Sequence, residues 1–308
     1  MGKIVMPADV LQFGISWPPF DLRRPLSPAA WTVVGALSIP LWATWPTLAV
    51  WASSMPAFEV LTVAFVVGWL VLKRLEPRAD ESVTQPRSLR RRYLPVFACT
   101  LGLCGSNAFF ILATSRLPAA QANLISYLWP VMVVGSGGLL GIFRLQARHF
   151  LGLGLGFAGA ATVLGGSITG SWAGAALALL SGASWAAYCL FRLREGAAAN
   201  DVLAPACGVS ALLCLGLHLS LETTVLPEPR ALLAAISVGI APLALANFAW
   251  DQGMRRGDGQ LLAVMAYATP LVSALLLILV GIAAASLNLL AGALMIVSAG
   301  MMSRGDRR

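Results

Sequence analysis

Two stretches of the sequence decide the fold. Residues 202–221 read VLAPACGVSALLCLGLHLSL and residues 231–250 read ALLAAISVGIAPLALANFAW, and neither contains Asp, Glu, Lys or Arg. As helices, runs of about 20 apolar residues rising ~1.5 Å each match the hydrocarbon core of a bilayer, which is roughly 30 Å thick. We therefore predict that each stretch is a transmembrane helix.

The remainder of the chain has the same character. Of its 308 residues, 58% are hydrophobic and 11% are charged, whereas a soluble domain carries about 25% charged residues. The sequence thus predicts an all-α polytopic membrane protein. Its ten expected transmembrane helices span residues 31–51, 56–72, 93–115, 119–143, 149–166, 172–191, 202–221, 231–250, 260–280 and 282–302.

The positive charges lie in short segments between these spans. The net charge is +8, which would also suit a nucleic-acid-binding protein, but the alternation of the charges does not. With the N-terminus inside, 19 Lys and Arg residues fall on one side and only Arg116 and Arg230 on the other. An excess of Lys and Arg is typical of the cytoplasmic loops of membrane proteins. We expect no nucleic-acid partner, a multi-pass protein of the bacterial inner (plasma) membrane, and cytoplasmic termini at residues 1–30 and 304–308.

An internal repeat appears when the sequence is shifted by 140 residues. Each half then holds five spans, at residues 31–166 and 167–303, and an odd number of spans turns the halves upside down relative to each other. Inverted repeats of this kind are a transporter architecture. The uncommon residues that coincide are Asn107 with Asn247, Arg116 with Arg256, Tyr127 with Tyr267, Pro130 with Pro270 and Trp45 with Trp185.

Three short motifs resemble a known family. They read SYLWP at 126–130, WAAYC at 185–189 and YATP at 267–270. They resemble the drug/metabolite transporter superfamily in its EamA branch, and within it most resemble the exporters of aromatic amino acids. The resemblance covers residues 31–303 and implies efflux of aromatic and other neutral amino acids. The substrate partner would be a small molecule, and the surrounding partner is the lipid bilayer.

Two prolines mark where helices are expected to bend. A proline inside a helix removes a backbone donor and loosens the contact with the carbonyl four residues earlier. Pro130 would leave the carbonyl of Ser126 without its helical hydrogen bond, and Pro270 would do the same for the carbonyl of Ala266. Carbonyls freed in a membrane need protein or a wet cavity to satisfy them. We expect both prolines to act as kink or gating positions beside a central cavity, although a simple packing kink is the alternative.

Aromatic and amide side chains are the candidates for binding in that cavity. Trp and Tyr supply flat apolar walls and ring faces that attract an ammonium group, and amides could bind a carboxylate. Trp129 would point away from Tyr127 on a regular helix, so both reach one cavity only if the helix is distorted. Interfacial belts and hydrogen bonds between helices are the alternatives. The candidates are Trp42, Asn107, Asn123, Tyr127, Trp129, Trp185, Tyr188, Asn247 and Tyr267.

No Asp, Glu, Lys or Arg lies at the centre of any predicted span. Glu59 is expected in the first turn of the second span and Asp251 at the inner end of the eighth, beside Arg255. A proton-coupled pump usually keeps an ionisable group within the membrane. We therefore favour alternating access without an obligatory buried carboxylate, while proton-coupled efflux of drugs or other metabolites through Glu59 or Asp251 remains the alternative.

Other classes of function fit less well. An intramembrane enzyme would need a nucleophile with a base or a metal cluster, and the two histidines form no such motif. An ion channel or an assembly subunit is a third possibility. We expect no catalytic residues, no cofactor and no metal, and the sequence leaves the oligomeric state open, a monomer included. The five cysteines lie inside apolar runs and are expected to pack as small residues.

Overall fold

A computed structural model describes residues 26–75, 89–114, 116, 122, 125–142, 146–163, 171–195, 202–281 and 287–302. Within these ranges every regular element is helical, so the all-α prediction is confirmed. Of the expected N-terminal segment, only the last five residues fall within the described part. The expected C-terminal tail lies outside it.

The helices follow the predicted spans in order. Among the described residues, five helical stretches are long and apolar enough to cross a membrane: Pro28–Trp51, Tyr93–Ala113, Trp172–Glu195, Leu203–Leu221 and Pro229–Arg256. The elements are α1 Pro28–Ala36, α2 Ser38–Ala43, α3 Trp45–Trp51, α4 Ala57–Leu75, α5 Leu89–Thr114, α7 Trp129–Leu139, α8 Ala147–Val163, α9 Trp172–Glu195, α10 Leu203–Leu221, α11 Pro229–Val238, the π-helix η2 Gly239–Ala246, α12 Asn247–Arg256, α13 Gly259–Met265, α14 Ala268–Leu279 and α15 Leu287–Met302.

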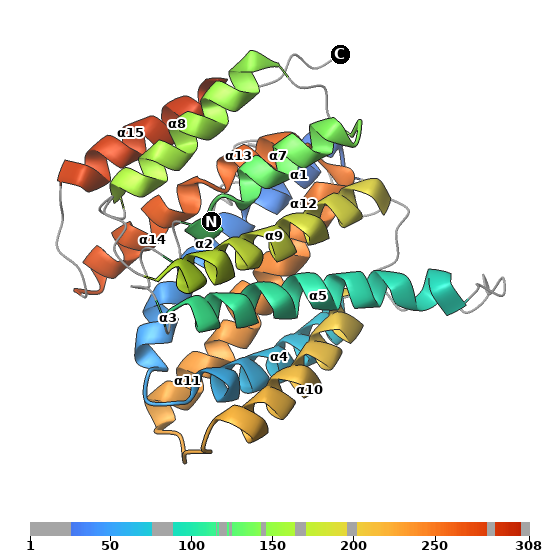
Figure 1. Cartoon of the computed structure of the whole chain (residues 1–308), viewed down its shortest axis with the longest axis vertical. Helices are drawn as coiled ribbons and strands as arrows, with labels where there is room; N and C mark the ends of the chain where they lie inside the picture. The colour runs from blue at the N-terminus through green and yellow to red at the C-terminus, as the bar shows by residue number, and fades with distance from the viewer. Residues whose placement is uncertain are drawn as a thin grey trace, which may run out of the picture.

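The helices form one bundle in which α8 and α15 pair at one end and α4, α5 and α10 gather at the other (Figure 1). α9 packs along α5, and α12 packs against α1 and α9 between these two groups. Segments distant in sequence therefore meet in the middle of the bundle. There, α2, α9, η2 and α14 come together with the start of α7.

Two of the expected helices are interrupted at tyrosines. The helical run that ends at Ser126 turns at Tyr127 and Leu128 before α7 begins, and α13 and α14 are separated by a turn at Ala266 and Tyr267. Pro130 therefore lies in the first turn of α7, where a missing N–H costs nothing. Pro270 has no N–H to donate to the carbonyl of Ala266. That carbonyl accepts from the N–H of Thr269 instead, at 3.0 Å.

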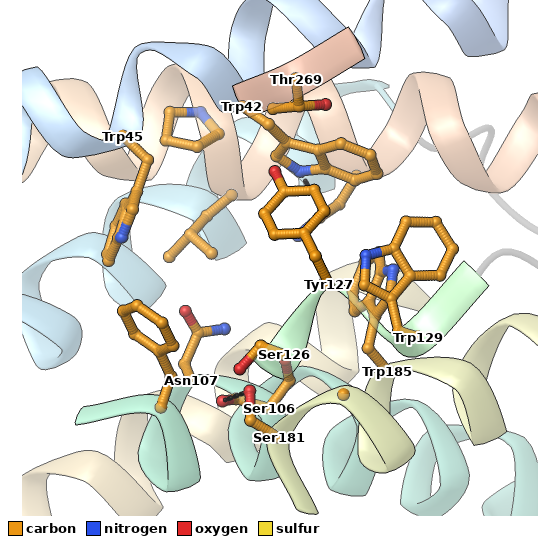
Figure 2. A pocket seen from close by; sticks show the side chains of 15 residues that line it. Trp42, Trp45, Ser106, Asn107, Ser126, Tyr127, Trp129, Ser181, Trp185 and Thr269 are labelled. Carbon is orange, nitrogen blue, oxygen red and sulfur yellow. Dashed lines mark hydrogen bonds between the residues drawn. The ribbon is translucent and has the colours of Figure 1, made fainter. Parts of the chain in front are cut away.

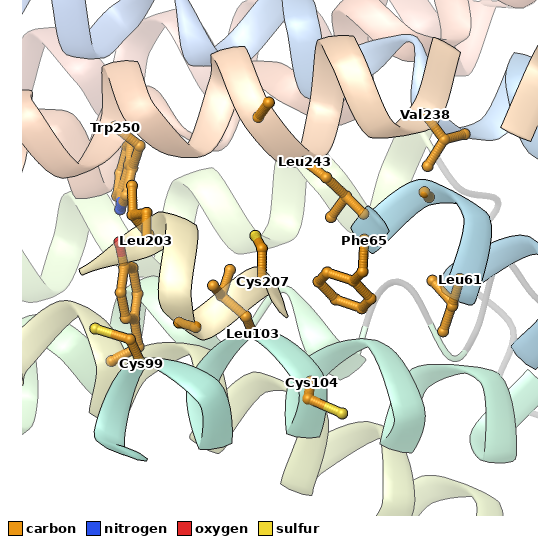
Figure 3. Close-up of a cluster of buried hydrophobic side chains, with 14 of the residues drawn as sticks. Leu61, Phe65, Cys99, Leu103, Cys104, Leu203, Cys207, Val238, Leu243 and Trp250 are labelled. Carbon is orange, nitrogen blue, oxygen red and sulfur yellow. The ribbon is translucent and has the colours of Figure 1, made fainter. Parts of the chain in front are cut away.

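The core is a large cluster of small, aliphatic and aromatic side chains (Figure 3). It contains all five cysteines, each buried, as the packing interpretation predicts. The outside of the bundle is apolar as well: Leu139 is 89% and Leu287 84% exposed. Lipid tails would cover such a surface, so close packing between helices, rather than exclusion from water, holds them together.

Candidate functional site

A cavity of about 190 Å³ lies at the meeting point of these helices (Figure 2). One water needs only about 10–15 Å³ measured this way, so the cavity has room for an organic molecule. None of the lining residues that the structure describes carries a charged side chain. The lining residues are Trp42, Trp45, Ser106, Asn107, Phe110, Ser126, Tyr127, Trp129, Ser181, Gly182, Trp185, Pro242, Leu243, Asn247 and Thr269.

Four tryptophans pack together on one side of the cavity. The ring of Trp185 is edge-on to Trp42, with centroids 5.5 Å apart, and to Trp129, with centroids 6.4 Å apart. Trp250 lies behind them, 5.0 Å from Trp42 and 5.5 Å from Trp129. Edge-to-face contacts over such distances are favourable for aromatic rings, so this wall is rigid and apolar.

The turn before α7 brings Tyr127 and Trp129 to the same cavity. A regular helix would direct two residues at this spacing to different faces, so the turn supplies the distortion that the sequence requires. Gly182 of α9 makes the turn possible, since a Cβ atom there would lie 2.6 Å from the carbonyl oxygen of Ser126. The hydroxyl of Ser126 also donates to the carbonyl of Ala178 at 3.0 Å, which fastens the turn to α9.

Two asparagines supply amides to the cavity. The indole N–H of Trp42 donates to Oδ1 of Asn247 at 3.0 Å, and Nδ2 of Asn107 donates to the carbonyl of Leu103 at 2.8 Å. A serine hydroxyl also bridges the walls, because Ser181 on α9 donates to the carbonyl of Ser106 on α5 at 2.9 Å.

Six of the nine candidate binding residues line the cavity: Trp42, Asn107, Tyr127, Trp129, Trp185 and Asn247. Tyr188 and Tyr267 are not among the lining residues and are almost fully buried. Tyr188 packs on Trp185 with centroids 5.0 Å apart, and Tyr267 packs where a Cβ at Gly156 would lie 2.7 Å from its ring. Asn123 lies outside the described residues.

Several lining residues escaped sequence reasoning, because small polar residues and single apolar ones carry no signal of their own. Pro242 is the exception, since a proline within an apolar run marks a distorted helix. It lies in η2, and such wide turns are frequent at functional sites. The residues concerned are Ser106, Phe110, Ser126, Ser181, Gly182, Pro242, Leu243 and Thr269, and Trp45, which the repeat matches to Trp185, lines the cavity as well.

Known proteins share this architecture. The model of the EamA-like transporter family matches residues 29–165. The chain is also 31% identical over 272 residues to the aromatic amino acid exporter YddG of Ancylobacter novellus, an alignment that covers 85% of this chain and 92% of that protein. This chain belongs to the EamA-like transporter family. It is a membrane-embedded, multi-pass transporter.

A solved crystal structure superposes on this EamA-like transporter with a TM-score of 0.80 and 29% sequence identity. The match covers 90% of this chain and 99% of the chain in the crystal structure. The fold seen in Figure 1 is therefore that of a known protein over nearly its whole length.

The transporter also holds a buried ion cluster that the sequence did not predict. The carboxylate of Asp251 on α12 accepts from Nε and Nη2 of Arg192 on α9, at 2.6 and 3.1 Å, and from Nε of Arg255 at 2.8 Å. Tyr188 donates its hydroxyl to the same carboxylate at 3.0 Å. A carboxylate of Glu195 contacts Arg192 as well.

The helices that carry this cluster run past the predicted spans. Span six is predicted to stop at residue 191 and span eight at 250. α9 continues to Glu195 and α12 to Arg256, and the side chains of Arg192, Asp251 and Arg255 are fully buried. Their burial is tolerated because each charge has an opposite charge with direct hydrogen bonds.

A second polar cluster joins the end of α10 to the start of α4. His218 bonds through Nδ1 to Glu222 and through Nε2 to the hydroxyl of Thr224, both at 2.9 Å. Glu222 also accepts from the backbone N–H of Phe58 with both oxygens, at 3.1 Å. Glu59 lies in the first turn of α4 as expected, 3.9 Å from His218. His218 thus forms a polar bridge between the end of α10 and the segment that follows it.

Proposed function

We propose that this transporter exports aromatic and other neutral amino acids by alternating access through the central cavity. The observation that carries the proposal is the character of its walls, which join four tryptophans, a tyrosine and a phenylalanine to two amides, with no charged side chain among the described lining residues. Small-molecule sites are mostly apolar with a few placed polar groups. A flat apolar side chain with a compact zwitterionic end matches such a site.

The aromatic wall supports an aromatic substrate in particular. Trp185 packs edge-on against Trp42 and Trp129, and the aromatic ring of a ligand is attracted to such a wall by the same kind of contact. Ring faces also attract an ammonium group. The relative in Ancylobacter novellus is named an aromatic amino acid exporter, which supports the same class of substrate here.

The proposal includes two inverted five-helix repeats, residues 31–166 and 167–303, with both termini cytoplasmic. Features 140 residues apart support it. Turns interrupt the helices at Tyr127 and at Tyr267. Gly141 and Gly281 both follow a helix with positive φ, +71° and +74°. Two similar halves can exchange conformations, which would open a central site to either side in turn.

The ion cluster would close the cytoplasmic end in the described state. In the proposed orientation Trp45 and Phe110 lie in the outer halves of their helices, whereas Arg192 and Asp251 lie at the inner ends. Trp250 stands between cavity and cluster, next to Asp251 in the chain and packed on the wall. Opening inward would separate α9 from α12 and break the Arg192–Asp251 pair.

The cluster also bears on energy coupling. The carboxylate of Asp251 is paired with two arginines. It therefore serves as their counter-ion and is not free to carry a proton. This favours flow down the solute gradient. The second candidate function, proton-coupled efflux of drugs or other metabolites, is favoured by the Glu59, His218 and Glu222 cluster, since ionisable side chains within membrane proteins often mark proton pathways.

Transport by the purified protein in proteoliposomes tests the proposal. Labelled tryptophan, phenylalanine and threonine should move faster than through empty liposomes, and the amino acid assignment is dropped if none does. Trp185→Ala should lower tryptophan transport at least tenfold because it removes the centre of the aromatic wall. Trp172→Ala is the matched control. Trp172 is 91% exposed, so this variant should transport tryptophan at the wild-type rate.

A further inference from the structure

The two cavity asparagines present opposite ends of their amides. Asn107 commits one N–H of its Nδ2 to the carbonyl of Leu103, which leaves its Oδ1 wholly free for a ligand. Asn247 commits one lone pair of its Oδ1 to the indole N–H of Trp42, which leaves its Nδ2 wholly free. One amide therefore offers an acceptor to the cavity and the other offers a donor.

The chemistry of the partners fixes both orientations. An indole N–H only donates, so the oxygen of Asn247 must face Trp42. A backbone carbonyl only accepts, so the nitrogen of Asn107 must face Leu103. Rotating either amide by 180° would place two donors or two acceptors together, which costs the hydrogen bond and leaves a buried polar group unpaired.

The remaining groups are available for a ligand. Within the described residues, each of the two asparagines makes only the hydrogen bond named above, and both line the cavity. Asn247 is only 3% exposed, so its free N–H₂ has little access to bulk water. Two of the three lining serines are committed as donors, Ser126 to the carbonyl of Ala178 and Ser181 to the carbonyl of Ser106.

We propose that this pair recognises the zwitterion of an α-amino acid, with Asn107 Oδ1 accepting from the ammonium and Asn247 Nδ2 donating to the carboxylate. The inference rests on the proposed function and narrows its substrate class. Since the lining is uncharged, a ligand with a net charge would enter without a counter-charge, which is costly away from water. The site thus selects against amines without a carboxylate and acids without an ammonium.

Trp42 is the positioning residue in this arrangement. Its N–H holds Asn247 with the donor toward the cavity, and its ring belongs to the aromatic wall. Replacing it with phenylalanine keeps an aromatic ring but removes the N–H, so the amide of Asn247 becomes free to rotate. Discrimination between ligands should then fall even though the apolar wall remains.

The test is equilibrium binding of labelled tryptophan and labelled tryptamine to the purified transporter, with indole-3-propionate as competitor. The wild-type protein should bind tryptophan at least tenfold more tightly than either analogue, a difference of about 1.4 kcal/mol. Asn247→Asp places a negative charge where the carboxylate would lie. It should weaken tryptophan binding at least tenfold and strengthen tryptamine binding, a gain that also reports a folded protein.

Two further variants keep the test decisive. Trp42→Phe should narrow the tryptophan-to-tryptamine ratio to below threefold. Asn288→Asp, an exposed amide in the first turn of α15, should leave both affinities unchanged. An unchanged ligand ratio in Asn247→Asp or Trp42→Phe overturns the inference, as does equal wild-type affinity for tryptophan and tryptamine. If tryptophan and phenylalanine do not bind the wild type at all, the proposed function itself fails.

Discussion

Replacing Asp251 by asparagine tests the ion cluster most directly. The carboxylate accepts four hydrogen bonds, three of them from the guanidinium groups of Arg192 and Arg255. Breaking a buried pair by removing one partner costs about 3–5 kcal/mol, because a charge stays buried without its counter-charge. Arg192 keeps its contact with Glu195, so we expect about 3 kcal/mol, the lower end of that range.

Unfolding by SDS in mixed micelles, followed by tryptophan fluorescence, would give the change in unfolding free energy. Asp258→Asn is the matched control. Asp258 caps α13 by accepting from the N–H of Leu261 at 2.9 Å, and asparagine caps a helix about as well, so less than about 0.5 kcal/mol should be lost. Combining Asp251→Asn with Arg192→Gln should cost less than the sum of the single changes. A loss below about 0.5 kcal/mol for Asp251→Asn would refute the account of the cluster.

Three further perturbations test the turns and the energy coupling. Gly182→Ala places a Cβ 2.6 Å from a carbonyl oxygen and should destabilise by about 1–3 kcal/mol, whereas a Cβ at Gly154 meets nothing within 4 Å and Gly154→Ala should not destabilise. Gly141→Ala and Gly281→Ala, both at positive φ, should each cost about 1–2 kcal/mol; a clear inequality in the same unfolding assay would count against equivalent turns in two repeats. Glu59→Gln should leave tryptophan transport and its pH response unchanged in proteoliposomes, and a lost pH response would instead favour proton coupling.

Much of the fold is predictable because membrane insertion imposes its constraint one segment at a time. Each span must be apolar over roughly 20 residues, so hydropathy alone locates 202–221, which the structure has as α10, Leu203–Leu221. The burial of charged residues near the helix ends was not predictable in this way. Arg192 and Asp251 are 59 residues apart. Neither segment by itself indicates that its charged residue will have a partner of opposite charge, which is what allows the residue to be buried.

The cavity residues, too, were only partly predictable from the sequence. Its tryptophans and asparagines stand out in sequence because they are large or polar within apolar runs, and six candidates line it. Tyr188 and Tyr267 are tyrosines within apolar runs, as Tyr127 is, yet they pack away from the cavity that Tyr127 lines. Residue type does not reveal which face of a helix meets the cavity once a turn has rotated the segment.

The sequence by itself determined the membrane class, the helical spans and the paired prolines, since hydropathy, charge alternation and backbone chemistry act within a segment. Only the tertiary structure decided how the polar groups are used. Trp42 and Asn247 are 205 residues apart, and their hydrogen bond alone sets which end of the amide faces the cavity. A donor and an acceptor satisfy each other only when both are in place, so this property depends on the folded arrangement of the helices.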